Sequence, residues 1–104
     1  MNAADRIRVE HMLEAAEEAI AIGRGHSRVS LLAVMKDIEI IGEAANKISP
    51  ELRIGEPGIP WGDIVGMRNR LIHAYFDVDP EFVWKTVAAD LPPLVHDLRR
   101  LLEK

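Results

Sequence analysis

Apolar residues recur along much of this chain at steps of three and four, which is the spacing of an amphipathic α-helix. A first stripe consists of Ile7, Met12, Leu13, Ala16, Ala19 and Ile20. A second consists of Leu31, Met35, Ile38, Ile41, Ala45 and Ile48. Asp5 precedes the first stripe as a candidate N-cap, and Gly23 predicts where that helix ends. Because the second helix can begin at Ser27 or Ser30, the pattern predicts two long helices within residues 1–48.

Prolines predict the boundaries in the second half of the chain. Residues 49–60 contain three prolines and two glycines, a composition that predicts a loop. Pro60 suits the first turn of a third helix, which we expect over residues 61–73 or 61–74. Asp79-Pro80 opens the last helix in the same way. The apolar stripe of this last helix consists of Val83, Val87, Leu91, Leu94, Leu98 and Leu101 or Leu102. Because the stripe continues across Pro92-Pro93, we expect one helix kinked there or two abutting helices.

Together these elements predict an all-α fold. No run of alternating apolar and polar residues demands a strand, and the connections between helices are mostly short. We therefore expect an antiparallel up-and-down bundle of four main helices, or five if the last one is interrupted. A length of 104 residues suits one domain, so we expect residues 1–104 to form a single helical domain.

Composition narrows the class of protein. Hydrophobic residues make up 48% of the chain and charged residues 29%, which is typical of a globular protein. The formal net charge of −4 argues against a protein that binds nucleic acid through a broad basic surface, but it leaves room for a local cationic pocket. Since the chain has no cysteine, disulfides and thiolate metal sites are excluded.

The beginning of the chain and its longest apolar runs bear on location. The first residues are polar and lack the apolar run of a signal peptide. No stretch approaches eighteen uninterrupted apolar residues. We therefore expect a cytoplasmic protein that does not cross a membrane.

The residues best suited to chemistry gather at the end of the predicted third helix. Arg68, Asn69, Arg70, His73 and Tyr75 lie within eight residues. Asn69 and His73, four apart, share a helix face, whereas Arg68 and His73 are about 140° apart on an ideal helix. A long Arg side chain could still converge on the imidazole, particularly where the helix ends, and a second subunit could bring in a second Arg or His.

Spacing alone does not identify this site. Arg6 and His11 reproduce the separation of Arg68 and His73 with no other mark of a site. An Arg and a His at a helix end are more often a cap and a partner of the helix dipole than a catalytic pair. Only the wider cluster of polar residues around Arg68 distinguishes the Arg68–His73 pair from the Arg6–His11 pair.

Other candidate groups have simpler interpretations. Glu39 and Glu43 lie four apart between Lys36 and Lys47, which predicts a solvated face or a Glu that anchors the Arg of the cluster. The remaining histidines lack metal-ligand spacing and are expected at the surface; they are His11, His26 and His96.

Five segments resemble a known family. Residues 66–75, Gly-Met-Arg-Asn-Arg-Leu-Ile-His-Ala-Tyr, are similar to the core motif of HepT-type toxins in the HEPN superfamily. Residues 38–46 upstream and Ile59-Pro60-Trp61 ahead of the motif extend the likeness, as do Val83-Trp84 and residues 90–92 downstream. The resemblance covers nearly the whole chain and is far more specific than the spacing of Arg68 and His73.

The resemblance implies a function and a set of partners. Such toxins are associated with metal-independent RNA cleavage by a homodimer, without a cofactor, and are commonly paired with a minimal nucleotidyltransferase antitoxin. Arg68 and His73 match the catalytic pair of the motif, with Asn69 and Arg70 as supporting residues. Tyr75 matches the tyrosine that the antitoxin modifies with adenylate.

The sequence leaves two alternatives open. One is a non-catalytic helical subunit that binds nucleotide or regulates a nucleotidyltransferase complex, and the net charge of −4 mildly favours it. The other is a structural dimerisation protein. The clustering of Arg68, Asn69, Arg70 and His73 favours the enzyme.

Overall fold

The computed structural model describes residues 1–73 and 80–103, and for residues 70–73 it describes the backbone. Its helices are α1 (Ala3–Gly23), α2 (Arg28–Asn46), α3 (Pro50–Gly55), α4 (Trp61–His73), α5 (Pro80–Lys85), a π-helical turn η1 (Thr86–Asp90) and α6 (Leu91–Leu102). No strand occurs in these residues, so the prediction of an all-α fold is confirmed.

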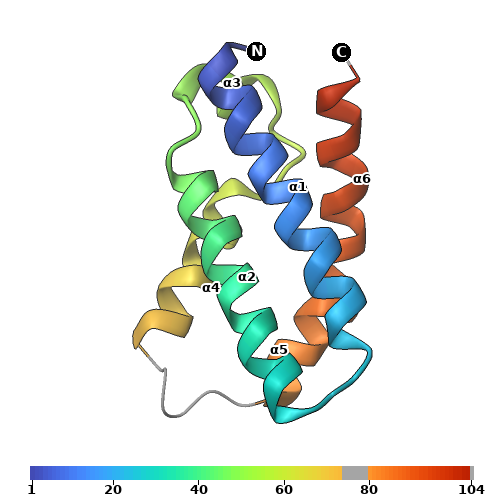
Figure 1. The fold of residues 1–104 in the computed structure, drawn as a ribbon. Coiled ribbons are helices and arrows are strands. Elements are labelled where there is room, and N and C mark those ends of the chain that lie inside the picture. The colour runs from blue at the N-terminus through green and yellow to red at the C-terminus, as the bar shows by residue number, and fades with distance from the viewer. Residues whose placement is uncertain (74–79, 104) are drawn as a thin grey trace.

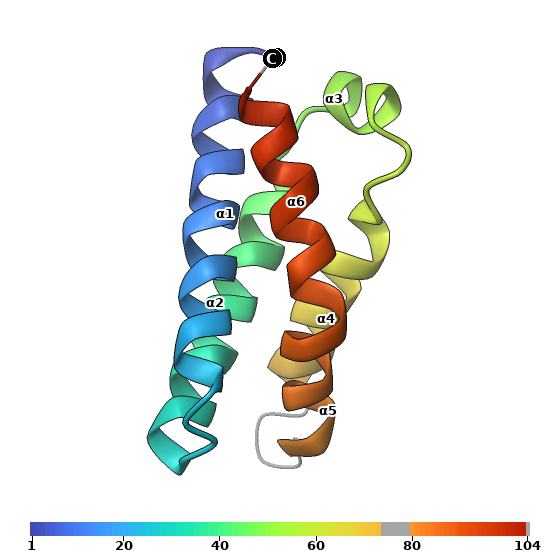
Figure 2. The same ribbon diagram turned by 90° about the vertical axis from the view of Figure 1, so that its right-hand side faces the viewer.

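The long helices form the predicted antiparallel bundle (Figures 1 and 2). α1 packs against α2 and α6, and α2 also packs against α4. Consecutive long helices run in opposite directions, so the N- and C-termini lie at the same end (Figure 1). α2 also touches α5, and α4 is held to the bundle mainly through α2.

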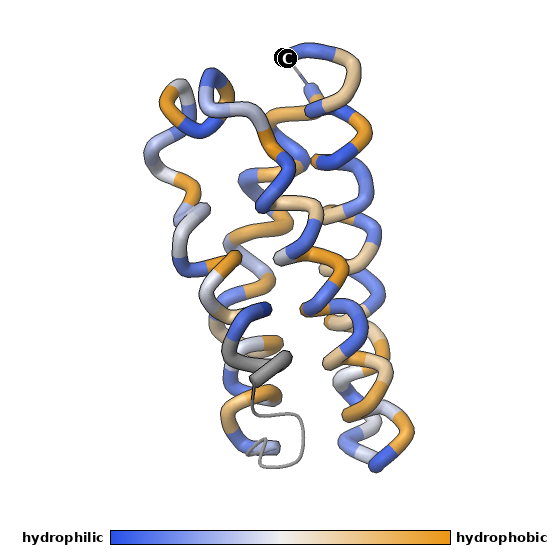
Figure 3. Tube along the Cα trace, turned by 90° about the vertical axis from the view of Figure 1, so that its left-hand side faces the viewer, coloured by the Kyte–Doolittle hydropathy of each residue, from blue (hydrophilic) through white to orange (hydrophobic). Residues whose placement is uncertain are grey.

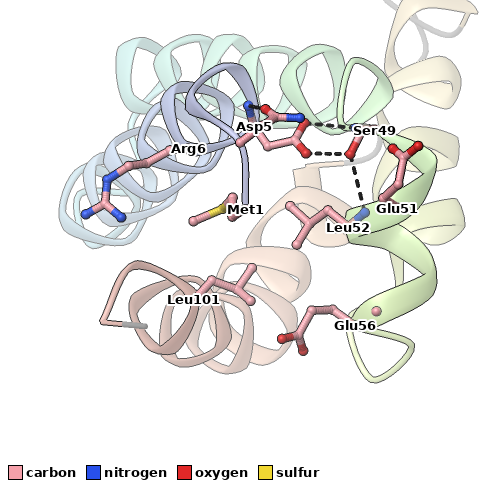
Figure 4. Close-up of a pocket in the computed structure, with 10 residues that line it drawn as sticks. Met1, Asp5, Arg6, Ser49, Glu51, Leu52, Glu56 and Leu101 are labelled. Atoms are coloured by element: carbon pink, nitrogen blue, oxygen red, sulfur yellow. Dashed lines mark hydrogen bonds between the residues drawn. The ribbon is translucent and has the colours of Figure 1, made fainter.

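The start of α1 differs from the prediction. The N-cap is Asn2, whose Oδ1 accepts a hydrogen bond of 2.7 Å from the Asp5 backbone N–H. Asp5 itself is buried in the first turn, and its carboxylate accepts hydrogen bonds from the Ser49 backbone N–H and hydroxyl (Figure 4). The prediction of Asp5 as the N-cap is wrong because a long-range partner takes its side chain. For α2, the predicted start at Ser27 is confirmed by a capping box that Ser27 forms with Ser30.

The predicted loop over residues 49–60 contains a short helix, α3. Ser49 is its N-cap, with Oγ accepting from the Leu52 N–H at 3.3 Å, and Pro50 occupies the first turn. A six-residue helix with no buried residue leaves no periodic apolar pattern in the sequence. The Ser-Pro pair therefore both follows α2 and begins α3.

The last predicted helix is α5, η1 and α6 in direct succession. The Leu91 N–H donates to the carbonyl of Thr86, five residues earlier, which is the π-helical pattern. Pro92 and Pro93 follow in the first turn of α6, where their missing N–H groups cost little. Of the two predicted alternatives, the structure shows two abutting helices, and the π-helical turn joins them.

The predicted apolar stripes form most of the core. Its fully buried larger side chains are Met12, Ile38, Ile41, Ile59, Leu91, Leu98, Val9, Val34 and Val83. Hydropathy alternates along the helices as this packing requires (Figure 3). Ile7 is the exception to the first stripe because it is 50% exposed. Among the described helices, none is long and apolar enough to cross a bilayer.

Candidate functional site

The predicted site lies in the second half of α4, toward the end of the bundle opposite the termini (Figure 1). Arg68 and Asn69 are described with their side chains. Arg70 and His73 lie in the last turns of the helix, where the description covers the backbone. Tyr75 lies outside the described residues. Convergence of Arg68 and His73 therefore stays a prediction.

One face of α4 fixes where Arg68 lies. Trp61, Ile64 and Met67 are buried at steps of three, so this face packs into the bundle. The Trp61 indole N–H donates to the Glu56 carbonyl at 3.1 Å, which anchors the start of the helix. Arg68 comes four residues after Ile64 and therefore lies beside the buried face. As a result its stem is half-buried against α2.

Arg68 is in close contact with Gly42 of α2. A Cβ built on Gly42 would lie 2.8 Å from Arg68 Cγ and still closer to Arg68 Cβ. At the other end of the side chain, Arg68 Nη1 donates to Asn69 Oδ1 at 3.2 Å. The structure thus brings together Arg68 and Asn69, two of the predicted site residues.

The charge of Arg68 is not neutralised within the described part of the chain. Arg68 forms no ion pair there, and its partner Asn69 is neutral. Arginines elsewhere do pair, as in Arg99 with Glu17 at 3.5 Å and Arg100 with Glu56 at 2.9 Å. An arginine without a carboxylate partner is suited to bind a phosphate.

The acidic residues on α2 are not the anchor for this arginine. Glu39 pairs with Lys36 at 3.6 Å, and Glu43 pairs with Lys47 at 3.7 Å. Of the two interpretations that the sequence allowed, the structure supports the solvated face.

The second Arg–His pair has a structural explanation. Arg6 pairs with Glu10 at 3.4 Å and donates to the Leu102 carbonyl at 3.3 Å, so it links α1 to α6. His11 is exposed, as are His26 and His96, which confirms their predicted surface location. Within the described residues, no three His, Asp or Glu side chains gather as a metal site would require.

Two hollows lined by described residues lie away from Arg68. The first, of about 710 Å³, is at the end that carries the termini, between Met1, Arg6, Leu52 and Leu101 (Figure 4). Both carboxylate oxygens of Asp5, which lines this hollow, already accept hydrogen bonds from Ser49. We therefore do not assign a catalytic role to this hollow.

A second hollow of about 420 Å³ lies between α4 and the segment from α5 to α6. Its floor includes Ile64 and Met67, and its charged lining residues are Asp63, Asp90 and Asp97. These carboxylates would repel RNA phosphates. We therefore do not place an RNA site there.

A buried acid, Asp37, lies on the core face of α2 and was not among the predicted residues. Burial first, and then a hydrogen bond with Glu18 on α1 and the negative charge of that residue, raise its pKa from 3.8 to about 7. Asp37 Oδ2 is buried and has no hydrogen-bond partner among the described residues. Its surroundings therefore favour the neutral, protonated form of Asp37. Its position four residues before Ile41, on the apolar stripe, was the available signal.

Fold and site together define a class: small all-α bundles that carry an Arg- and His-containing cluster near the end of one helix. The HepT-like ribonuclease family matches residues 6–101, which is most of the chain. The chain belongs to the HepT-like ribonuclease family.

Relatives agree with this assignment. The chain is 34% identical over 103 residues to a "Putative RNase" of Caldanaerobacter subterraneus subsp. tengcongensis, covering 92% of each chain. It is 45% identical over 69 residues to a "Probable ribonuclease HepT" of Thermococcus cleftensis, covering 66% of this chain and 63% of the relative. A "Putative RNase" of Methanocaldococcus jannaschii is 42% identical over 66 residues, covering 64% of this chain and 61% of the relative. No solved structure matches the chain at a significant level.

Proposed function

We propose that this protein is the toxin of a toxin–antitoxin pair, a metal-independent endoribonuclease with Arg68 and His73 as its catalytic residues. Membership of a ribonuclease family supports the reaction class. The observation in the structure that carries the proposal is Arg68, whose stem is packed on Gly42 and whose guanidinium has only the neutral Asn69 as its described partner. A cation held in this way is ready to bind the scissile phosphate of RNA.

The proposed reaction uses the RNA's own 2′-hydroxyl. Neutral His73 takes the proton of that hydroxyl, since the unperturbed pKa of histidine is about 6.5. The 2′-oxygen bonds to phosphorus as the bond to the 5′-oxygen breaks, and the 5′-oxygen takes a proton from water. Arg68 stabilises the charge on the phosphoryl oxygens, with Arg70 as a supporting cation. The products are a 2′,3′-cyclic phosphate and a 5′-hydroxyl.

Regulation is proposed to act on Tyr75. A minimal nucleotidyltransferase antitoxin would transfer adenylate to its hydroxyl, adding bulk and negative charge beside Arg68 and Arg70. RNA would then be excluded by steric overlap and charge repulsion. We propose a homodimer as the active form, because a second copy could complete the cleft.

Cleavage of a defined RNA by purified protein in excess EDTA tests the proposal. The wild-type protein should leave 2′,3′-cyclic phosphate ends, whereas Arg68→Ala and His73→Ala should lose activity by at least ~100-fold, as expected for removal of a transition-state donor or general base. Arg99→Ala is the matched control because Arg99 pairs with Glu17 away from the cluster. Full cleavage by both site variants would overturn the assignment.

The rival function is a non-catalytic subunit that binds nucleotide or regulates a nucleotidyltransferase, which the net charge of −4 favours. It predicts no RNA cleavage by the wild-type protein but binding of ATP or AMP by calorimetry. The same preparations therefore separate the two functions.

A further inference from the structure

Gly42 occupies an unusual place for a glycine. It lies within α2 on the buried face, and none of the glycines has a positive φ. The backbone there is one that alanine adopts more favourably, because glycine weakens a helix interior. A reason other than conformation must therefore explain a glycine at this position.

The neighbouring helix supplies that reason. A Cβ on Gly42 would lie 2.8 Å from Arg68 Cγ, closer still to Arg68 Cβ, and 3.3 Å from the Ile64 carbonyl oxygen. Arg68 Cβ and the Ile64 carbonyl are fixed by the backbone of α4, so rotation of a side chain cannot relieve the overlap. Of the seven glycines, Gly42 has the closest neighbours, and four others have none within 4 Å.

We infer that Gly42 is a positioning residue for Arg68 and that it sets where the guanidinium meets the phosphate. This inference rests on the proposed ribonuclease function. The stem of Arg68 lies on the α2 backbone, and its far end is held by Asn69 Oδ1 at 3.2 Å. Contacts at both ends restrict the rotamers of a long side chain before substrate binds. Asn69 acts in the same arrangement as a second positioning residue.

A displaced arginine should slow the reaction without removing the cation. In Gly42→Ala, α4 has to move away from α2 by enough to admit a methyl group. A misplacement on the order of 1 Å can cost roughly 100-fold in rate. We expect Gly42→Ala to lower the cleavage rate by at least ~10-fold. Gly62→Ala is the control, because Gly62 lies in α4 and nothing is within 4 Å of its built Cβ.

A ratio separates a positioning role from simple loss of folded protein. Each variant cleaves one RNA with a phosphate at the scissile linkage and one with a phosphorothioate there. The folded fraction of the protein affects both rates equally and cancels in their ratio. A contact between Arg68 and a non-bridging oxygen affects the two rates differently, because sulfur replaces that oxygen in the phosphorothioate. Gly42→Ala should shift the ratio toward that of Arg68→Ala, and Gly62→Ala should keep the wild-type ratio. A wild-type rate and ratio in folded Gly42→Ala would overturn the inference.

A stability cycle tests the contact independently of catalysis. Gly42→Ala should lower the urea midpoint much more in the wild-type background than in Arg68→Gly, which lacks both Cβ and Cγ and leaves only the 3.3 Å approach to the Ile64 carbonyl oxygen. If Gly42→Ala alone does not fold, recovery of folding in the double variant supports the contact, and failure to recover overturns it. If the wild-type protein cleaves no RNA, the proposed function falls and the positioning role with it, while the cycle still reports whether the two residues touch.

Discussion

Asp37 is a buried acid whose surroundings strongly raise its pKa. It is only 4% exposed, yet it faces Glu18 across the contact between α1 and α2. His11 and Glu14 line the same small hollow, so the pair lies among other titratable groups. Its charge state therefore bears on how tightly the two longest helices pack.

This pair predicts a stability that falls as pH rises. The pKa of Asp37 is raised from 3.8 in the unfolded chain to about 7, so the folded state holds the extra proton between these values. The contribution is fully present below pH 4 and is lost as pH rises to about 7. The slope for one proton cannot exceed ~1.4 kcal/mol per pH unit. Urea unfolding from pH 4 to 8 measures it.

Asp37→Asn isolates the effect from other titrating groups. The amide stays neutral, so the difference in unfolding free energy between variant and wild type should move in favour of the variant from pH 4 to 7. Glu39→Gln, on the same helix in an ion pair with the exposed Lys36, should give a difference without that trend. A pH-independent difference for Asp37→Asn would mean that Asp37 titrates normally.

At the scale of elements, the sequence predicted the helices whose apolar residues repeat often enough to show a period. α1, α2 and the segment from α5 to α6 are of this kind, whereas α4 was predicted from Pro60 at its start. α3 escaped because it buries nothing, and the turn η1 escaped because spacings of four fit either an α-helix or a slightly wider one. The local cluster around Arg68 was likewise visible in sequence. The contact of Arg68 with Gly42 was not, because it depends on where α4 crosses α2.

Periodicity predicted the burial of residues at the edge of an apolar stripe less well than that of residues at its centre. Two residues of α1 allow a matched test. Met12 is fully buried, whereas Ile7 of the same predicted stripe is 50% exposed. Met12→Ala should therefore lower the free energy of unfolding by about 2–5 kcal/mol through lost burial and a cavity. Ile7→Ala should change it by no more than about 0.5 kcal/mol. Urea denaturation of both variants measures these changes. Equal losses of unfolding free energy would mean that Ile7 is buried, either in the core or in an interface.

At the scale of the whole molecule, an acidic protein that binds RNA must confine the attraction to a few cations. The formal net charge is −4, and the hollow beside α4 is lined by Asp63, Asp90 and Asp97. Repulsion from most of the surface would favour one orientation of the RNA strand, with Arg68 and Arg70 toward the phosphates. Binding strength should then depend only weakly on salt compared with a protein that uses a broad basic face.

The salt dependence of RNA binding measures the number of these contacts. With single-stranded RNA each neutralised phosphate contributes about −0.7 to the slope of log K against log salt, so two contacts per protomer predict about −1.4, or about −2.8 for a dimer. Inactive His73→Ala protein allows binding to be measured without cleavage. Adding Arg68→Ala should make the slope shallower by about 0.7 per protomer. Adding Arg99→Ala should not, because Arg99 is paired with Glu17. A slope steeper than about −4 that survives Arg68→Ala would instead require an extended basic surface, against the charge distribution of the described residues.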